Sequence, residues 1–204
     1  MIVDQFNTTF PDDSADCSPE NRNTSRRRSG SILVTKPEGR LGNQLFAFSH
    51  LIAYALDNGY RILNPSFYHY GHFFSGTCRD PLCRIPQLRW GFAPKFTFNM
   101  AGWLAKHFHS LVKRLPSLFT FIDAGGSITD LEDDVIKRHV ESKKPLIFYG
   151  WTFRCGTCVH LYENEIRNYF RPIEKHQSAI DRLHENIRRN CDILIGVHIR
   201  RGDF

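Results

Sequence analysis

Residues 31–63 predict a strand, a glycine turn, a helix and a second strand, and this unit constrains the fold more than any other segment. The β-branched run at 31–35 is typical of a strand, and apolar residues recur at helical spacing through 44–58. Asn43 is the expected N-cap of this helix, and Gly59 is its expected C-cap. The run at 60–63 supplies the second strand. A unit of this length is typical of a crossover between parallel strands, so it predicts a parallel sheet.

Strand and helix patterns alternate along the rest of the chain. Apolar runs predict strands at 119–123 and 145–149, and a closing strand that starts at residue 192. Helical spacing predicts helices at 99–114, 129–140, 161–170 and 173–190. Lysines and histidines in the helix at 99–114 indicate a solvated face, whereas the helix at 173–190 has an apolar face. The alternation predicts an α/β fold in which helices flank a mainly parallel sheet.

The domain organisation follows from composition. Residues 1–30 are polar, with an acidic part and a basic run at 26–28, and we expect them to form a disordered tail. Residues 31–204 are expected to form one α/β domain. Within it, the aromatic and proline-rich segment 64–95 predicts either a loop packed on its own rings or a loop that binds an acceptor.

The net charge limits the kinds of partner that the chain can bind, and the lack of targeting signals bears on its location. The net charge of +6 is compatible with phosphates, sugar nucleotides, nucleic acid or an anionic membrane surface. No apolar run is long enough to span a bilayer, and residues 1–5 lack the start of a signal peptide. We therefore expect a cytoplasmic location, and peripheral association with a membrane remains an alternative. The glycosylation sequons at Asn7 and Asn23 are interpreted as chance.

The six cysteines include two close pairs, Cys78 with Cys83 and Cys155 with Cys158. Such pairs could bind zinc, form local disulfides or redox pairs, or remain thiols. Because the second C-x-x-C of a zinc site is lacking, we expect no metal. The histidines show no metal-ligand spacing, so most of them are expected at the surface or in packing.

Two motifs could carry chemistry. The first is the turn from Gly39 to Gln44, where glycines would let a ligand approach the backbone and the following helix would offer free N–H groups. The second is His198-x-Arg200-Arg201-x-Asp203, which follows the apolar run 193–197. Two guanidinium groups at the end of a buried strand would bind a dianion at the rim of a sheet. Structural alternatives remain for both motifs: a tight turn for the first, and a surface Arg201–Asp203 pair with a packed His198 for the second.

Together the two motifs resemble the fucosyltransferases of glycosyltransferase family 11, the galactoside α-1,2-fucosyltransferases, which are related to the α-1,6- and protein O-fucosyltransferases. The segments 148–154 and 166–172 are similar to the region before the arginine motif in bacterial members. The resemblance implies inverting, metal-independent transfer of fucose from GDP-fucose to a glycan hydroxyl, with no cofactor. It also implies a GT-B-like fold, in which this chain would supply the N-terminal Rossmann-like domain.

The resemblance further implies roles for individual residues. Arg200 would grip the donor pyrophosphate, supported by His198 and Arg201. Arg40 and Asn43 would face the reaction centre. Gly39, Gly42 and Asp203 would complete the donor site, and no general base is assigned.

Family members continue well beyond the arginine motif, so we expect this chain to lack the C-terminal domain and to be inactive alone. An alternative from another class is a non-catalytic carbohydrate- or nucleotide-binding remnant of the fold. A basic nucleic-acid-binding module is the third alternative, and it ranks last. The partners that the resemblance implies are GDP-fucose and a glycan acceptor, with no nucleic acid.

Overall fold

The fold is described from a computed structural model that covers residues 30–36, 39–87, 93–124, 128–131, 133, 136, 144–189 and 191. The predicted tail to residue 29, with both sequons, lies outside these residues. The closing strand predicted from residue 192, with the motif at 198–203, lies outside them as well.

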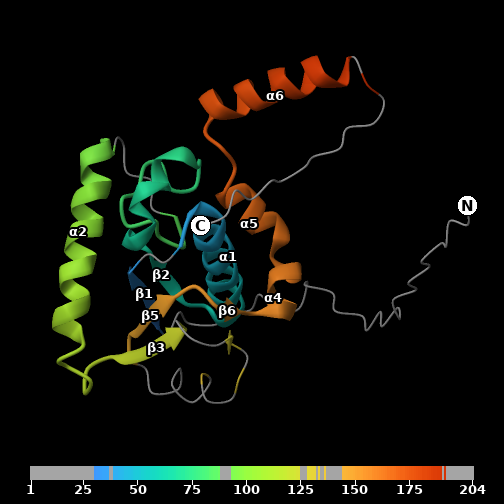
Figure 1. Ribbon diagram of the computed structural model, residues 1–204. Coiled ribbons are helices and arrows are strands. Elements are labelled where there is room, and N and C mark those ends of the chain that lie inside the picture. The colour runs from blue at the N-terminus through green and yellow to red at the C-terminus, as the bar shows by residue number, and fades with distance from the viewer. Residues whose placement is uncertain are drawn as a thin grey trace, which may run out of the picture.

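A four-stranded parallel sheet forms the centre of the described structure (Figure 1). Its strands are β1 (Ser31–Lys36), β2 (Arg61–Leu63), β3 (Thr120–Ala124) and β5 (Leu146–Gly150), in the order β2-β1-β5-β3. All three neighbouring pairs are parallel. A separate parallel pair joins β4 (Thr129–Asp130) to β6 (Phe153–Arg154). The predicted α/β class with a mainly parallel sheet is confirmed.

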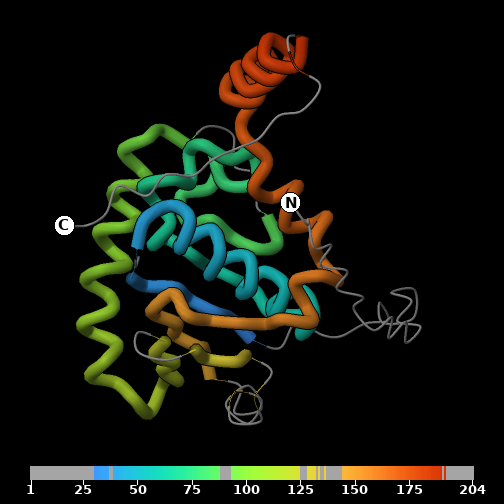
Figure 2. The backbone as a smooth tube through the Cα atoms, turned by 45° about the vertical axis from the view of Figure 1, so that its right-hand side comes forward, coloured from blue at the N-terminus to red at the C-terminus, as the bar shows by residue number. Residues whose placement is uncertain are grey.

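Helices cover both faces of this sheet (Figures 1 and 2). Helix α1 (Leu41–Asn58) lies on one face with α4 (Gly156–Leu161) and α5 (Glu163–Tyr169), and α2 (Lys95–Val112) lies on the other. Period-two alternation along β1 explains this division: Ile32 and Val34 join the core beneath α1, whereas Leu33 and Thr35 face α2. Both faces of β1 are therefore buried, as expected of a central parallel strand.

Aromatic rings form much of the core on the α1 face. Phe48 of α1 is 1% exposed, and its ring meets those of Phe67, Tyr169 and Phe170 edge to face at 5.5 Å between centroids. Phe67 belongs to the irregular segment after β2, which holds two short 3-10 helices, η2 (Pro65–His69) and η3 (Gly71–Phe73). The rings of this segment thus pack on α1 and α5, not only on one another.

The N-terminus of α1 differs from the prediction. The helix begins at Leu41, so Asn43 lies in its first turn, and the expectation that Asn43 is the N-cap is wrong. Arg40 occupies the cap position and makes no side-chain cap bond. Instead, the Gln44 side chain donates to the carbonyl of Gly39 at 3.0 Å and ties the turn to the helix. The predicted C-cap is confirmed, because Gly59 adopts the left-handed conformation with φ of 70°.

The predictions of two other helices, at 129–140 and 161–170, were wrong in part. Residues 129–130 form a strand because they pair with β6, a long-range contact that helical spacing does not reveal. The segment predicted as one helix at 161–170 lies across α4 and α5, which separate at Tyr162, where φ and ψ are −112° and 25°. Much of 129–140 lies outside the described residues.

The two amphipathic helices also differ from expectation. Helix α6 (Glu174–Arg188) buries no residue, and its apolar Ile180 and Leu183 are 40% and 57% exposed. Helix α2 begins four residues before the predicted start, and beside the exposed Lys106 and His107 of the predicted solvated face it carries exposed large apolar side chains, which were not predicted. None of the described helices is both long and apolar enough to cross a bilayer.

Candidate functional site

The turn between β1 and α1 requires glycine at position 39. Gly39 has φ of 72°, a conformation that side chains disfavour. A Cβ atom added there would lie 2.5 Å from Nδ2 and 2.8 Å from Cβ of Asn43. Gly42, by contrast, is helical and has no atom within 4 Å of an added Cβ. The close approach of Gly39 and Asn43 therefore sets the shape of the turn.

This difference between the two glycines predicts opposite effects of alanine. Gly39→Ala is expected to lower the free energy of unfolding by about 1–2 kcal/mol, the cost of the left-handed conformation. Gly42→Ala is the matched control and is expected to raise it by up to about 1 kcal/mol, because alanine favours the helix. Urea unfolding of both variants checks this. Equal effects at the two positions would contradict the described turn.

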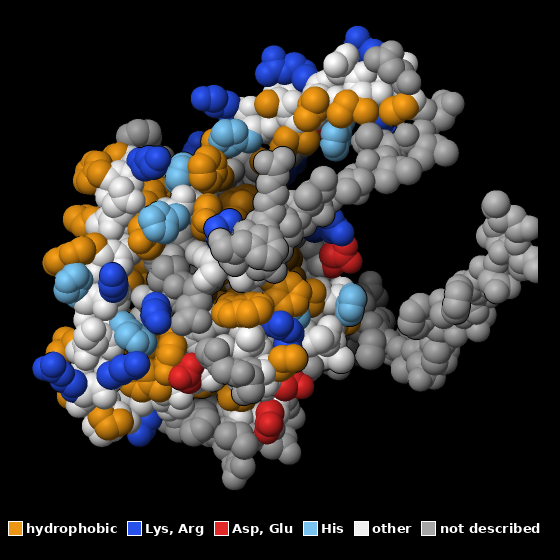
Figure 3. Space-filling view, in the orientation of Figure 1, with side chains coloured by type: hydrophobic (Ala, Val, Ile, Leu, Met, Phe, Trp, Pro, Cys, Tyr) orange, Lys and Arg blue, Asp and Glu red, His pale blue; other side chains and the backbone are white. Residues whose placement is uncertain are grey.

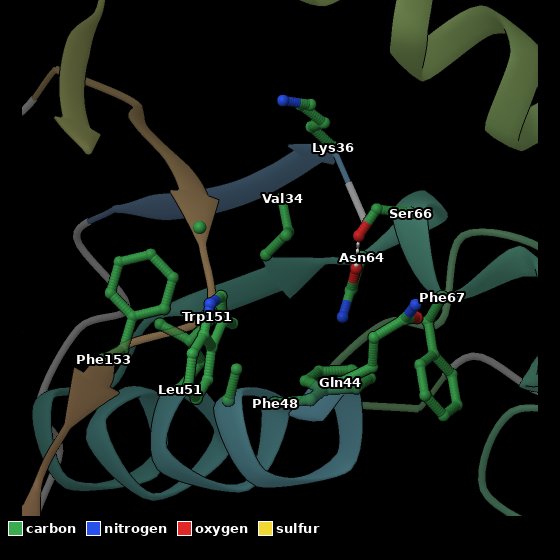
Figure 4. Close-up of a pocket in the computed structure, with 12 residues that line it drawn as sticks. Val34, Lys36, Gln44, Phe48, Leu51, Asn64, Ser66, Phe67, Trp151 and Phe153 are labelled. Carbon is green, nitrogen blue, oxygen red and sulfur yellow. Dashed lines mark hydrogen bonds between the residues drawn. The ribbon is translucent and has the colours of Figure 1, made fainter. Parts of the chain in front are cut away.

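The turn lies beside a small cavity at the carboxyl ends of three strands (Figure 4). Residues that end or follow β1, β2 and β5 line it, together with the first turns of α1, and the full set is Val34, Lys36, Gln44, Ala47, Phe48, Leu51, Asn64, Ser66, Phe67, Gly150, Trp151 and Phe153. Open parallel sheets bind ligands at this edge. The cavity volume of about 20 Å³ suits a single water molecule and is too small for a sugar.

Polar side chains line one end of the cavity. Asn64 directly follows β2 and is 4% exposed, and its Oδ1 accepts a hydrogen bond of 2.6 Å from the Ser66 hydroxyl. Figure 4 shows the Asn64 amide nitrogen directed toward the cavity, and the Lys36 side chain directed away from it. Asn64 and Ser66 were not among the site residues predicted from the sequence. A polar residue directly after a buried strand was the signal that could have found them.

Basic side chains lie near the N-terminus of α1 among the residues that the structure describes. The first turn of α1 contains no acidic residue, and Arg40 makes no side-chain cap bond. Arg40 lies at the cap position, and the guanidinium of Arg154 lies 4.4 Å from the ring centroid of Phe46 in α1. The uncapped N–H groups and the positive end of the helix dipole attract anions. This edge of the sheet can therefore accept a phosphate group.

A second polar cluster lies on the α2 face of the same edge. The Thr35 hydroxyl and Nδ1 of His109 are 2.7 Å apart, and the Tyr149 hydroxyl donates to Asp123. Thr35 is the extra residue where the β1–β5 register shifts, and such bulges redirect side chains. Burial, reinforced by Lys113 and Lys36, lowers the pKa of His109. The His109 ring is therefore neutral at pH 7. This cluster was not predicted, because its members share no local sequence motif.

Each of the five described cysteines is a thiol. Of the two close pairs, Cys155 and Cys158 are both buried beneath α1. The Cys155 backbone N–H donates to Nδ1 of His50 at 2.9 Å, which fastens α1 to the start of α4. Burial lowers the pKa of His50 and keeps its ring neutral. Within the described ranges, no group of three or more His, Cys, Asp or Glu residues could bind a metal ion.

The structure brings together half of the predicted site residues. Gly39, Arg40, Gly42 and Asn43 share one turn at the carboxyl edge of the sheet. The other four, His198, Arg200, Arg201 and Asp203, lie outside the described residues. The comparisons with known proteins found no matching family model, curated protein or solved structure.

Proposed function

We propose that this chain belongs to an inverting, metal-independent glycosyltransferase that transfers fucose from GDP-fucose to a hydroxyl of a glycan. The parallel α/β unit would be the N-terminal Rossmann-like domain of a GT-B-like fold. The proposal rests on the two sequence motifs, and one structural observation supports it best. The glycine turn that resembles the family lies at the carboxyl edge of a parallel sheet, beside an uncapped helix N-terminus.

The chemistry of the transfer explains why these residue types matter. The acceptor oxygen bonds to C1 of fucose on the face opposite the departing diphosphate, and the bond from C1 to the β-phosphate oxygen breaks. GDP leaves, and the proton of the acceptor hydroxyl passes to a base or to solvent. Without a metal, fixed donors must stabilise the negative charge that develops on the diphosphate. Arg200 would do this by bidentate hydrogen bonds. Arg40 and the first-turn N–H groups of α1 would add positive potential beside it.

Equilibrium binding of GDP-fucose in the presence of EDTA tests the proposal. We expect saturable binding that GDP competes away. Arg40→Ala should weaken it about 10- to 100-fold, the effect of losing a hydrogen bond from a charged donor. Arg61→Ala is the matched control, because Arg61 is exposed at the start of β2, on the opposite edge of the sheet, and it should leave the affinity unchanged.

Absence of GDP-fucose binding, or equal losses in the two arginine variants, would contradict the proposal. Saturable binding without transfer is the result expected of this chain alone. Transfer to a lactose-type acceptor would support the proposed reaction and would contradict the expectation that the chain is inactive alone.

A further inference from the structure

The outer face of α2 is a second feature that the proposed function does not use. Its inner face packs on η2, β1 and η3 through Phe98, Ala101, Ala105 and Val112, all buried. The outer face consists of large apolar side chains that are 52–66% exposed: Phe96, Met100, Trp103, Leu104 and Leu111. Figure 3 shows hydrophobic side chains along the edge of the molecule where α2 lies, with Lys and His side chains among them.

This apolar surface continues beyond the outer face in two directions. Leu115 and Leu118, in the turns that follow α2, are 40% and 58% exposed. On the other side, a groove of about 580 Å³ runs between α2 and the segment after β2, lined largely by apolar side chains such as Leu33, Leu82 and Phe108. Contiguous exposed apolar surface of this kind marks an interaction site.

Helix α2 itself contains basic residues and no Asp or Glu. The acids next to it in the sequence are Asp80, which lines the groove, is 3% exposed and pairs with Arg84, and Asp123, which lies in β3.

Lys95 and Lys106 of α2 and Lys113, which directly follows it, are exposed, and their spacing places them in one row. The Lys113 ammonium lies 4.8 Å from the centre of the Tyr149 ring, so Lys95 and Lys106 are the lysines of this row with no such contact described. At 100° per residue, this row lies at one border of the outer face, opposite the groove. Lysine stems can cover apolar surface while the ammonium groups reach a polar layer.

We propose that the outer face of α2 docks the protein on the surface of an anionic lipid bilayer. Aromatic and aliphatic side chains on one face, with a border of lysines and no acids, are the pattern of a helix that lies in the membrane interface. Trp103 suits the boundary between head groups and acyl chains. The lysine row would attract anionic head groups while the apolar side chains enter the boundary region.

A second copy of the chain fits this surface less well. Pairing two outer faces would bring two lysine rows together, and α2 contains no carboxylate to balance them. An anionic bilayer balances that charge and buries the apolar side chains at the same time. The inference concerns where the protein acts, and it stands independently of the proposed sugar transfer.

Sedimentation with lipid vesicles tests the docking surface. We expect the chain to bind vesicles of phosphatidylcholine with 30% phosphatidylserine, and to bind pure phosphatidylcholine vesicles far more weakly. The Lys95→Gln/Lys106→Gln variant should bind the anionic vesicles about 30-fold more weakly, since each lysine near such a surface contributes roughly fivefold. Lys175→Gln, at an exposed position on α6, is the charge control and should bind as the unchanged chain does.

Substitutions of apolar residues in the outer face of α2 form the second part of the vesicle-binding experiment. Trp103→Glu/Leu111→Glu should abolish vesicle binding, whereas Ile180→Glu/Leu183→Glu, the matched exposed pair on α6, should not. Circular dichroism and melting curves confirm that both variants fold. Equal binding to neutral and anionic vesicles, no binding to either, or a dimer in solution that Trp103→Glu dissociates would each overturn the proposal. Nucleotide binding by the Trp103→Glu/Leu111→Glu variant should be unchanged, which separates this proposal from the proposed function.

Discussion

Phe48→Ala is expected to lower the free energy of unfolding by about 3–5 kcal/mol, the cost of removing a fully buried aromatic ring. Three rings meet Phe48 edge to face at 5.5 Å, from the segment after β2, from α5 and from the residue that follows α5. Each such pair contributes about 0.5–1.5 kcal/mol beyond the area that it buries. Since domains of this size are stable by only about 5–15 kcal/mol, the variant should be largely unfolded in mild denaturant.

Phe46→Ala is the matched control for this prediction. Phe46 lies on the same helix two residues earlier, is 46% exposed, and meets the guanidinium of Arg154 at 4.4 Å. Its loss should therefore cost no more than about 1 kcal/mol, the value of an exposed cation–π contact. Chemical denaturation of both variants, followed by circular dichroism, measures the difference. Similar losses at the two positions would mean that the aromatic core does not join α1 to α5 as described.

Arg200→Ala is expected to weaken GDP binding by about 100-fold or more, because two charged hydrogen bonds to the diphosphate are lost together. The affinity for guanosine, which has no phosphate, should change little. This pair of measurements separates a pyrophosphate grip from a general loss of the nucleotide site. Calorimetric titration of the unchanged chain and the variant with each ligand provides the test.

Arg188→Ala is the control for the loss of one positive charge. Arg188 is exposed near the end of α6 and should leave GDP binding unchanged at physiological salt. If Arg188→Ala weakened binding as much as Arg200→Ala, the effect would reflect net charge alone. If Arg200→Ala bound GDP normally, the role that the resemblance implies for the second motif would be wrong.

Local patterns were sufficient to predict β1, α1 and β2. The apolar spacing of α1 and the C-cap at Gly59 lie within one continuous segment, so neighbouring residues determine them. The predicted start of the helix was wrong because the turn is joined to the helix by a bond from the Gln44 side chain to the Gly39 carbonyl, and not by an N-cap at Asn43. The strand order β2-β1-β5-β3 could not be predicted, because β1 pairs with β5, more than 100 residues away in the sequence.

The candidate site shows the same limit. Gly39 and Asn43 could be identified because the chemistry of a glycine turn is local. Asn64 and Trp151 reach the same cavity only because β2 and β5 end at the same edge of the sheet. Thr35 and His109 are likewise brought together by the packing of α2 on the sheet, across 74 residues of sequence. Periodicity indicates which elements form, whereas the residues that meet are determined by how those elements pack.

Amide hydrogen exchange with and without GDP tests the central claim most directly. The first N–H groups of α1 have no partner within the helix, so they should exchange rapidly in the unliganded chain. We expect GDP to slow exchange in peptides that cover residues 39–44 and 197–204, and to leave α6 unchanged. Saturating binding without any protection at 39–44 would place the nucleotide elsewhere and contradict the account.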